Sequence, residues 1–285
     1  MRMILTRWSD IAAAREAYHN LNALLAEDEK YAERMTLPAP AGQLRVRDLV
    51  IQPPKARAPV LHDISLSLDR GEVLAVIGPS ASGKTTLLKA LTGLWKPLSG
   101  SVRLDGAEVS EWLRGDLGRY LGYVPQEIEF FEGTVAENIA RLGDVDPEEV
   151  VRATRRVGLH SMILSFPKGY ETKLGENGHP LTSGQKQRLA LARALYGRPG
   201  YVLLDEPDAS LDDNGQKALA RTIREAAASG TTFIFSTHRA ELLEIASKVL
   251  VLNEGRVQWF GNIAEFRAAA ASVAETRAAS VREGE

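Results

Sequence analysis

Short apolar runs recur along the middle of this chain, with helical patterns between them. Residues 73–77, 201–204, 233–235 and 249–252 are almost wholly apolar, and each run is followed by glycine or polar residues. Continuous runs of this kind are typical of strands that are buried on both faces. Helical stretches between such strands indicate a mainly parallel sheet with helices on both faces. We therefore predict an α/β fold.

Two further patterns surround these runs. Hydrophobic and polar residues alternate at 44–49 and 64–68, which predicts half-buried strands, and residues 52–59 form a proline-containing loop between them. The segments 134–165 and 184–197 have helical patterns. We expect a helical subdomain, at about 127–195, to interrupt the strands of the core.

The two ends of the chain are predicted to be helical. Residues 8–30 carry apolar side chains at three- and four-residue steps, and Pro38 and Pro40 then prevent the helix from continuing. The tail from Ile263 is rich in alanine. These patterns divide the chain into a helix in residues 1–36, a linker at 37–42, a main domain at 43–262 and a tail at 263–285.

Composition excludes several classes of function. The 35 basic and 37 acidic residues give a net charge of −2, so no global basic excess indicates nucleic-acid binding. The chain has no cysteine, which excludes disulfides and thiol catalysis. No apolar run reaches about 18 residues, and the N-terminus does not resemble a signal peptide. If the protein serves a membrane process, we expect the spanning segments to lie in another chain or upstream.

A glycine-rich loop follows the run at 73–77. Residues 78–85 satisfy the pattern G-x-x-x-x-G-K-[ST], with a strand predicted before them and a helix after them. Such loops point backbone N–H groups at phosphate oxygens, and the helix N-terminus adds positive charge. A glycine turn with a chance Lys-Thr is the alternative, and the strand–loop–helix context disfavours it. The predicted ATP-binding residues are Gly78, Pro79, Ser80, Ala81, Ser82, Gly83, Lys84, Thr85 and Thr86.

Two adjacent carboxylates, Asp205 and Glu206, end the buried run at 201–204. Ligands of open α/β sheets bind at the carboxyl ends of the strands, where these side chains emerge. Asp205 suits Mg²⁺ binding, and Glu206 suits the role of general base toward an attacking water. An acidic turn capped by Pro207 is the alternative, which the phosphate loop makes less probable.

Four more segments stand in the order found in ABC ATPases, and over 43–262 the chain resembles that family. Residues 123–126 resemble its Q-loop, 181–185 its signature motif, 210–212 its D-loop and 236–239 its H-loop. The resemblance implies a P-loop NTPase fold with a mainly parallel core sheet, an antiparallel β subdomain and a helical subdomain. It also implies that two such domains, in a homodimer or a heterodimer, enclose two ATP molecules.

The resemblance also assigns roles to residues. Glu206, His238 and Gln126 are implied to be catalytic, while Thr85, Gln126 and Asp205 are implied to bind Mg²⁺. A lone histidine at a strand end is more often structural, but the ordered set of motifs favours function for His238. The family's signature residues, which contact ATP of the opposite subunit, correspond to Thr182, Ser183, Gly184 and Gln185. The D-loop residues correspond to Ser210, Leu211 and Asp212.

Further segments resemble exporters of type I protein secretion, namely 90–97, 131–139 and the loop 173–178 before the signature. Residues 1–36 resemble the cytoplasmic end of the transmembrane domain of such exporters. The implied partners are a second ATPase subunit and a transmembrane exporter domain, on the cytoplasmic face of the inner membrane, and no nucleic acid. The alternatives are an importer ATPase, a soluble ABC protein acting on nucleic acid or ribosomes, and a degenerate member that binds ATP without turnover.

Three segments depart from the family pattern. Thr182 and Ser183 replace the usual Ser-Gly of the signature, and His179-Pro180 precede it where small residues are commoner. We expect Ser183 to slow hydrolysis, because its Cβ stands where the backbone needs glycine freedom or a close approach to phosphate. Residues 52–59 contain no aromatic side chain for stacking on adenine. The sequence therefore leaves the preference for ATP over GTP unassigned.

Overall fold

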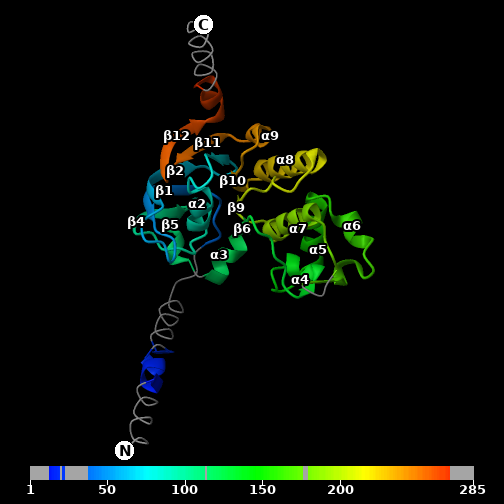
Figure 1. Cartoon of the computed structure of the whole chain (residues 1–285). Coiled ribbons are helices and arrows are strands. Elements are labelled where there is room, and N and C mark those ends of the chain that lie inside the picture. The colour runs from blue at the N-terminus through cyan, green and yellow to red at the C-terminus, as the bar shows by residue number, and fades with distance from the viewer. Residues whose placement is uncertain (1–12, 20, 23–37, 113, 176–178, 270–285) are drawn as a thin grey trace, which may run out of the picture.

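A six-stranded sheet lies at the centre of the computed structural model, which describes residues 13–19, 21–22, 38–112, 114–175 and 179–269. Its strand order is β12-β11-β3-β10-β9-β6 (Figure 1). All neighbours are parallel except β11 and β12, which are antiparallel. The predicted mainly parallel core sheet is confirmed. Its strands are β3 (Val73–Ile77), β6 (Leu121–Val124), β9 (Tyr201–Leu204), β10 (Thr232–Ser236), β11 (Lys248–Asn253) and β12 (Arg256–Asn262).

A second, four-stranded sheet is antiparallel throughout and has the order β2-β1-β4-β5. Its first strand extends to Ile51, beyond the predicted alternation at 44–49. The pairing register with the next strand shifts between Val46 and Leu49, where Asp48 has a φ of 47°. The strands of this sheet are β1 (Leu44–Ile51), β2 (Leu61–Leu68), β4 (Ser99–Leu104) and β5 (Ala107–Glu108). A two-stranded ribbon is formed by β7 (Gly133–Thr134) and β8 (Lys173–Leu174).

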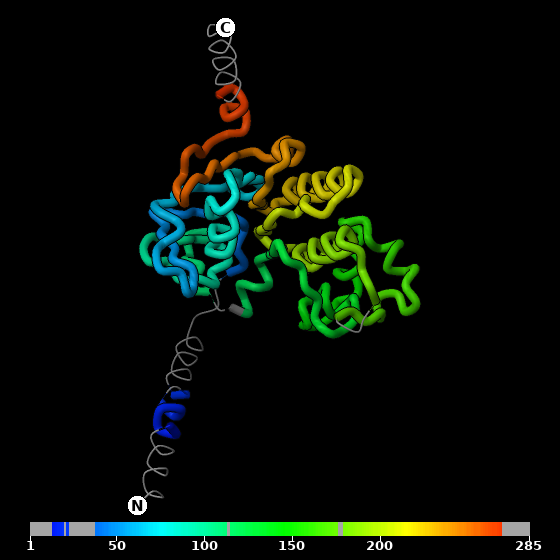
Figure 2. Tube along the Cα trace, viewed as in Figure 1, coloured from blue at the N-terminus to red at the C-terminus, as the bar shows by residue number. Residues whose placement is uncertain are grey.

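Helices cover the central sheet. Other helices, α4 to α7, form a separate part at one side of the sheet, called the side part below (Figures 1 and 2). The α-helices are α2 (Lys84–Leu91), α3 (Arg114–Tyr120), α4 (Val135–Ile139), α5 (Pro147–Arg156), α6 (His160–Leu164), α7 (Ser183–Leu195), α8 (Asp213–Ala228) and α9 (Ala240–Leu243), and the 3₁₀ turns are η1 (Val109–Glu111) and η2 (Gly169–Glu171). The side part falls within the segment for which a helical subdomain was predicted.

Alternate residues of the central strands face two different hydrophobic cores. On β10, Phe233 and Phe235 pack with residues of α5, α7 and α8, whereas Ile234 packs with the antiparallel sheet and α2. All three side chains are fully buried. Burial on both faces explains why these strands have continuous apolar runs rather than an alternating pattern.

The predicted helical stretch at 134–165 is divided into three helices, and local backbone chemistry sets the breaks. Arg141 and Leu142 have φ values of 60° and 58°, which end α4. Asp146 then caps α5, accepting hydrogen bonds from two first-turn N–H groups, and Pro147 occupies the first helical position. Gly158, with a φ of 68°, follows α5.

The Arg141 guanidinium joins the side part to the core. It donates to carbonyl oxygens at the end of α7, at 3.1 Å for Arg193 and 3.1 Å for Ala194, and to that of Leu121 in β6 at 3.0 Å. It also contacts the carbonyl of Gly118 in α3. The last carbonyls of a helix have no partner within the helix, and a cation there is stabilised by the helix dipole. Burial lowers the pKa of Arg141, and a charged group buried in this way requires hydrogen-bond partners such as these carbonyl oxygens.

We expect Arg141→Ala to lower the free energy of unfolding by about 2–4 kcal/mol, since it leaves several partly buried carbonyls unpaired. Urea unfolding followed by circular dichroism measures this loss. Arg221→Ala is the matched control, because Arg221 lies exposed on α8 and pairs with Glu225 of the same helix. The control is expected to change stability by less than about 0.5 kcal/mol. Equal effects of the two substitutions would show that Arg141 does not join these elements.

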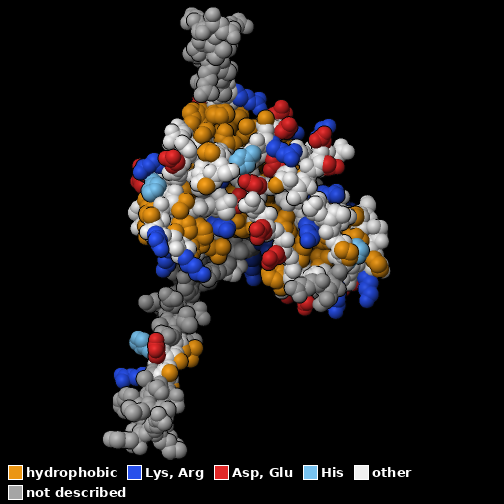
Figure 3. All heavy atoms as spheres, in the orientation of Figure 1, with side chains coloured by type: hydrophobic (Ala, Val, Ile, Leu, Met, Phe, Trp, Pro, Cys, Tyr) orange, Lys and Arg blue, Asp and Glu red, His pale blue; other side chains and the backbone are white. Residues whose placement is uncertain are grey.

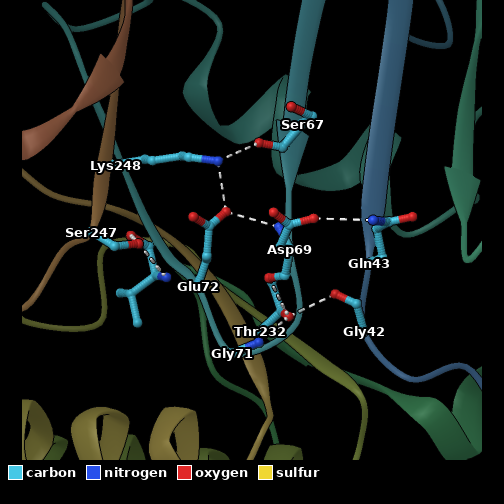
Figure 4. A network of polar contacts seen from close by, with 10 residues as sticks. Gly42, Gln43, Ser67, Asp69, Gly71, Glu72, Thr232, Ser247 and Lys248 are labelled. Carbon is cyan, nitrogen blue, oxygen red and sulfur yellow. Dashed lines mark hydrogen bonds and ion pairs between the residues drawn. The ribbon is translucent and has the colours of Figure 1, made fainter.

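A polar network anchors the start of the main domain at the amino ends of the central strands (Figure 4). The Thr232 hydroxyl donates to the carbonyl oxygen of Gly42 at 2.7 Å and accepts from the N–H of Gly71 at 3.0 Å. The Gln43 amide donates to Asp69 at 3.0 Å. These contacts hold the chain where it enters β1, at the end of the sheet opposite to the phosphate loop.

Parts of both predicted terminal helices are described. Residues 13–19 and 21–22 are helical and exposed, with Tyr18 and Leu21 of the predicted apolar face 66% and 54% exposed. Residues 263–269 are helical. The rest of the predicted helix at 8–30, and residues 270–285 of the tail, lie outside the described residues. No helix among the described residues combines the length and the hydropathy needed to cross a bilayer.

Candidate active site

The glycine loop curls between the end of β3 and the start of α2. Gly78 has a φ of 154° and Gly83 a φ of 104°. A Cβ at Gly78 would lie 2.1 Å from the carbonyl oxygen of Leu252, so a side chain cannot be accommodated there. Gly83 precedes the first residue of α2, and no side chain caps this helix. The first-turn N–H groups of α2 are therefore available to an anion.

Lys84 lies inside the curl of this loop. Its Nζ donates to the carbonyl oxygens of Gly78 at 2.9 Å and Pro79 at 3.0 Å, and the residue is 6% exposed. Burial lowers the pKa of Lys84, while the nearby negative charges of Glu206 and Asp205 act in the opposite direction. The loop thus binds the buried ammonium group of Lys84 through two carbonyl oxygens. Phosphate oxygens can replace these carbonyl oxygens as acceptors of its hydrogen bonds.

The acidic pair emerges at the carboxyl end of β9, as the sequence predicts. Asp205 is 1% exposed, and its Oδ1 accepts a hydrogen bond from the Ser236 hydroxyl at 2.7 Å. Its Oδ2 is buried and has no hydrogen-bond partner within the described part of the chain. A buried carboxylate oxygen without a partner is costly, and a cation or its water ligand would satisfy it.

Three residues from distant parts of the sequence meet at the Glu206 carboxylate. Gln126, just after β6, donates from Nε2 to Oε2 of Glu206 at 3.2 Å. His238, just after β10, places Nε2 at 3.3 Å from Oε1. The Glu206 side chain is 25% exposed, so water reaches it. The structure therefore brings together the three residues that the resemblance assigned to catalysis, on three adjacent strands of the sheet.

The predicted metal ligands are oxygen donors of mixed type. The described residues contain no cluster of three or more His, Cys, Asp or Glu side chains that could hold a metal alone. Mg²⁺ commonly takes one or two carboxylates from a protein, and other oxygen donors, waters and substrate phosphates complete its coordination. Thr85, Gln126 and the free Oδ2 of Asp205 fit that requirement.

The signature residues form the N-terminus of α7. Thr182 caps the helix by accepting from the N–H of Gln185 at 3.3 Å, and the Gln185 side chain accepts from the N–H of Thr182 at 2.9 Å. Ser183 is the first helical residue and is exposed. Its φ is not positive, so the backbone here does not require glycine, and that part of our expectation for Ser183 is wrong. Only the bulk of its side chain can impede a phosphate.

The D-loop lies directly against the signature helix. A Cβ added at Gly184 would lie 3.8 Å from the carbonyl oxygen of Ser210 and 3.9 Å from the side chain of Leu211. Leu211 is buried, and Asp212 caps α8 by accepting from the N–H of Gly215 at 2.8 Å. The D-loop and the N-terminus of α7 are thus neighbours in the fold.

Of the exporter-type loop at 173–178, Lys173 and Leu174 pair with β7, and Gly175 has a φ of 108°. Residues 176–178 lie outside the described residues.

One contact in the site was not predicted from the sequence, namely that of the Ser236 hydroxyl, because His238 was the one H-loop residue that was given a role. The hydroxyl of Ser236 contacts the Asp205 carboxylate and the N–H of Glu206. The sequence marks Ser236 only as the polar residue that follows the apolar run 233–235.

Comparisons with known proteins identify the family of this chain. The family model for ABC transporter matches residues 61–209. PrsD, a type I secretion system ATP-binding protein of Rhizobium meliloti, is 40% identical over 262 residues, which are 92% of this chain and 45% of that protein. A putative ABC transporter ATP-binding protein of Pyrococcus furiosus is 44% identical over 215 residues, covering 73% of this chain and 79% of that protein.

A solved structure shows the same similarity in three dimensions. The ATP-bound structure of a bacterial Atm1-family ABC exporter aligns with a TM-score of 0.76 and 30% identity. The alignment covers 87% of this chain and 43% of the exporter chain. This chain thus spans less than half the length of the secretion protein and of the exporter, and the predicted P-loop fold of the ABC ATPase type is confirmed.

Proposed function

Because this chain belongs to the ABC transporter family, we propose that it binds Mg-ATP, hydrolyses it and thereby drives a membrane exporter. Type I secretion of protein or peptide is the process that we favour. The observation that carries the proposal is the convergence of Gln126 and His238 on the Glu206 carboxylate, whose charge acts on Lys84 of the phosphate loop.

ATP binding is assigned to residues 78–86. The triphosphate would accept hydrogen bonds from the loop N–H groups and from the first turn of α2. Lys84 would exchange the carbonyl oxygens of Gly78 and Pro79 for β- and γ-phosphate oxygens. When bound, Mg²⁺ neutralises charge on these phosphates, and Thr85, Gln126 and Asp205 are the residues that would hold it.

Hydrolysis is assigned to Glu206 as general base. A water in line with the γ-phosphate gives its proton to the Glu206 carboxylate while its oxygen bonds to phosphorus, and the bond from the γ-phosphorus to the β-phosphate oxygen breaks to release ADP. Gln126 and His238 fix the direction of the carboxylate through their contacts of 3.2 and 3.3 Å. The His238 side chain is 48% exposed, and by family resemblance it would contact the γ-phosphate.

A second ATPase domain is proposed to complete each site. The N-terminus of α7, with Thr182, Ser183 and the small Gly184, would bind the γ-phosphate held by the partner's loop. Whether the partner is an identical or a related chain is left open. ATP would join the two domains, and its hydrolysis would release them.

We expect Ser183→Gly to hydrolyse ATP faster, by about two- to tenfold, which corresponds to about 0.4–1.4 kcal/mol in the activation barrier. The exposed serine side chain would otherwise stand between the helix and the phosphate. Phosphate release at saturating ATP measures the rate. A rate equal to or below that of the parent would show that the serine does not impede catalysis.

The exporter assignment is supported by the similarity to a type I secretion protein and to an Atm1-family exporter. Since these relatives are more than twice as long as the aligned part, their transport activity comes to this chain only as a proposal. We propose that residues 1–36 and the linker 37–42 lead into the ATPase domain at 43–262 and that residues 263–285 form a tail. Charged side chains of both signs are interspersed on the face seen in Figure 3, with no large area of one sign there.

The partner is proposed to be a transmembrane exporter domain, which would hold this chain on the cytoplasmic face of the inner membrane. Affinity purification from detergent-solubilised membranes tests this assignment. We expect a membrane protein with six spanning helices to co-purify and to stimulate ATP hydrolysis. Activity only with an importer that uses a substrate-binding protein would reject the exporter, and stimulation by nucleic acid alone would reject any transporter.

A further inference from the structure

Two hydroxyl side chains at the carboxyl end of β10 tie this strand to the segment that follows β9. Ser236 and Thr237 are both fully buried. The Ser236 hydroxyl donates to Oδ1 of Asp205 at 2.7 Å and accepts from the N–H of Glu206 at 2.8 Å. One small side chain therefore contacts both members of the acidic pair.

The contact with Asp205 distinguishes its two carboxylate oxygens. A serine hydroxyl has a single proton to donate, and Ser236 gives it to Oδ1. The other oxygen, Oδ2, is left as the one without a partner in the part of the chain that the structure describes. Because turning the carboxylate about its Cβ–Cγ bond would break this contact, Ser236 fixes the plane of the carboxylate and the direction in which its unpaired oxygen points.

The contact with Glu206 supports an unfavourable backbone conformation. Glu206 has a φ of 48°, in the left-handed region that non-glycine residues rarely adopt. Such residues persist only where the surrounding structure holds them. The hydrogen bond from its N–H to Ser236 holds the backbone from which the carboxylate projects toward Gln126 and His238.

Thr237 makes a parallel contact one residue later. Its hydroxyl donates to Oδ2 of Asp208 at 2.7 Å and accepts from the N–H of Arg239 at 3.0 Å. Asp208 is 3% exposed. Thr237 and Arg239, which flank His238, are thus connected by hydrogen bonds to Asp208, which follows Glu206 in the chain. The same network of hydrogen bonds therefore holds the backbone near both His238 and Glu206.

We propose that Ser236 is a positioning residue for hydrolysis, which orients Asp205 toward the bound cation and holds the backbone of Glu206 for proton abstraction. This inference rests on the proposed function. Ser236 acts through the two acidic residues that its hydroxyl contacts. Ser236→Ala removes the donor and the acceptor together.

The test compares Ser236→Ala with the parent and with a matched control in the full chain. Thr232→Val serves as control, because Thr232 is an equally buried hydroxyl at the other end of β10, bonded to Gly42 and Gly71. We expect Ser236→Ala to lower kcat by about ten- to a hundredfold, the effect of one lost charge-assisted hydrogen bond, with the KM for ATP changed less than about twofold. The control is expected to keep the parental kcat.

A binding measurement separates positioning from general loss of structure. Mn²⁺ is titrated into the protein with a non-hydrolysable ATP analogue, and free Mn²⁺ is followed by electron paramagnetic resonance. We expect Ser236→Ala to raise the dissociation constant of Mn²⁺ about three- to thirtyfold, because Asp205 is no longer oriented, while Thr232→Val does not change it. Ser236→Thr, which keeps the hydroxyl, is expected to restore both kcat and Mn²⁺ affinity to within about threefold.

Each outcome decides between two claims. If the parent has no ATPase activity, the proposed function fails. If the parent is active and Ser236→Ala matches it in kcat and Mn²⁺ affinity, or if Thr232→Val is equally impaired, only the positioning role is overturned. Should Ser236→Ala fail to fold, as judged by thermal melting, Ser236→Cys replaces it, since the thiol keeps the volume and is a weaker donor.

Discussion

Replacing Glu206 with Gln is expected to slow ATP hydrolysis by about 10²–10⁴-fold, the range that a positioned general base contributes. Glutamine keeps the shape of the side chain, but its amide cannot accept a proton from water at neutral pH. The Gln126 side chain, at 3.2 Å, holds the Glu206 carboxylate in position. Steady-state phosphate release at saturating Mg-ATP measures the effect.

The same variant should retain ATP. Because Lys84 and the glycine loop are unchanged, we expect the affinity for Mg-ATP to stay within about threefold of the parental value, well below one tenfold step of 1.4 kcal/mol. An ATP-bound pair of chains should then accumulate, with a doubled mass by light scattering.

Glu225→Gln is the control for this substitution, since Glu225 is an exposed residue that pairs with Arg221 on α8. It should hydrolyse ATP at the parental rate. If Glu206→Gln also hydrolyses at the parental rate, Glu206 is not the base and another acceptor must be sought.

Removing the lysine of the glycine loop should have the largest effect on binding. We expect Lys84→Ala to weaken the binding of Mg-ATP by about 2–5 kcal/mol, or at least about 30-fold, the cost of truncating one partner of a buried charge contact. Lys84 is buried, and its Nζ donates hydrogen bonds to the carbonyl oxygens of Gly78 and Pro79 in the loop. Without it, the triphosphate loses the cation that the loop itself supplies. Isothermal titration calorimetry with Mg-ATP measures the loss.

Lys89→Ala provides the matched control, because Lys89 lies in the last turn of the same helix, over the ring of Trp95. Its removal should leave the affinity for Mg-ATP unchanged within about twofold. Equal weakening by both variants would point to a disturbed helix rather than to a lost phosphate contact. Unchanged binding by Lys84→Ala would contradict the assignment of the phosphate site.

The sequence predicted those features that arise from local patterns. Continuous apolar runs predicted the buried strands, and the strand–loop–helix order predicted where the phosphate loop would lie. The shared sheet edge of β6, β9 and β10 explains why Gln126, Glu206 and His238 meet, although 80 residues separate the first two. Parallel strands place their carboxyl ends together, so this convergence follows once the strands are known.

Features that depend on contacts between distant elements were not predictable in this way. The role of Arg141 depends on carbonyl groups of α3, β6 and α7, and no periodicity marks such partners. The expectation that Ser183 occupies a position needing glycine freedom was wrong, since the conformation of a helix N-terminus cannot be read from a motif. The short strands β5, β7 and β8 have too few residues to show alternation.

The proposed function requires the chain to hold one ATP on the loop at 78–86. Equilibrium dialysis of the purified protein with labelled ATP and Mg²⁺ measures this binding. We expect saturation at one ATP per chain, with displacement by unlabelled ATP or ADP. Failure to retain nucleotide at millimolar concentrations, in protein that remains folded, would contradict the account and remove the basis for the exporter assignment.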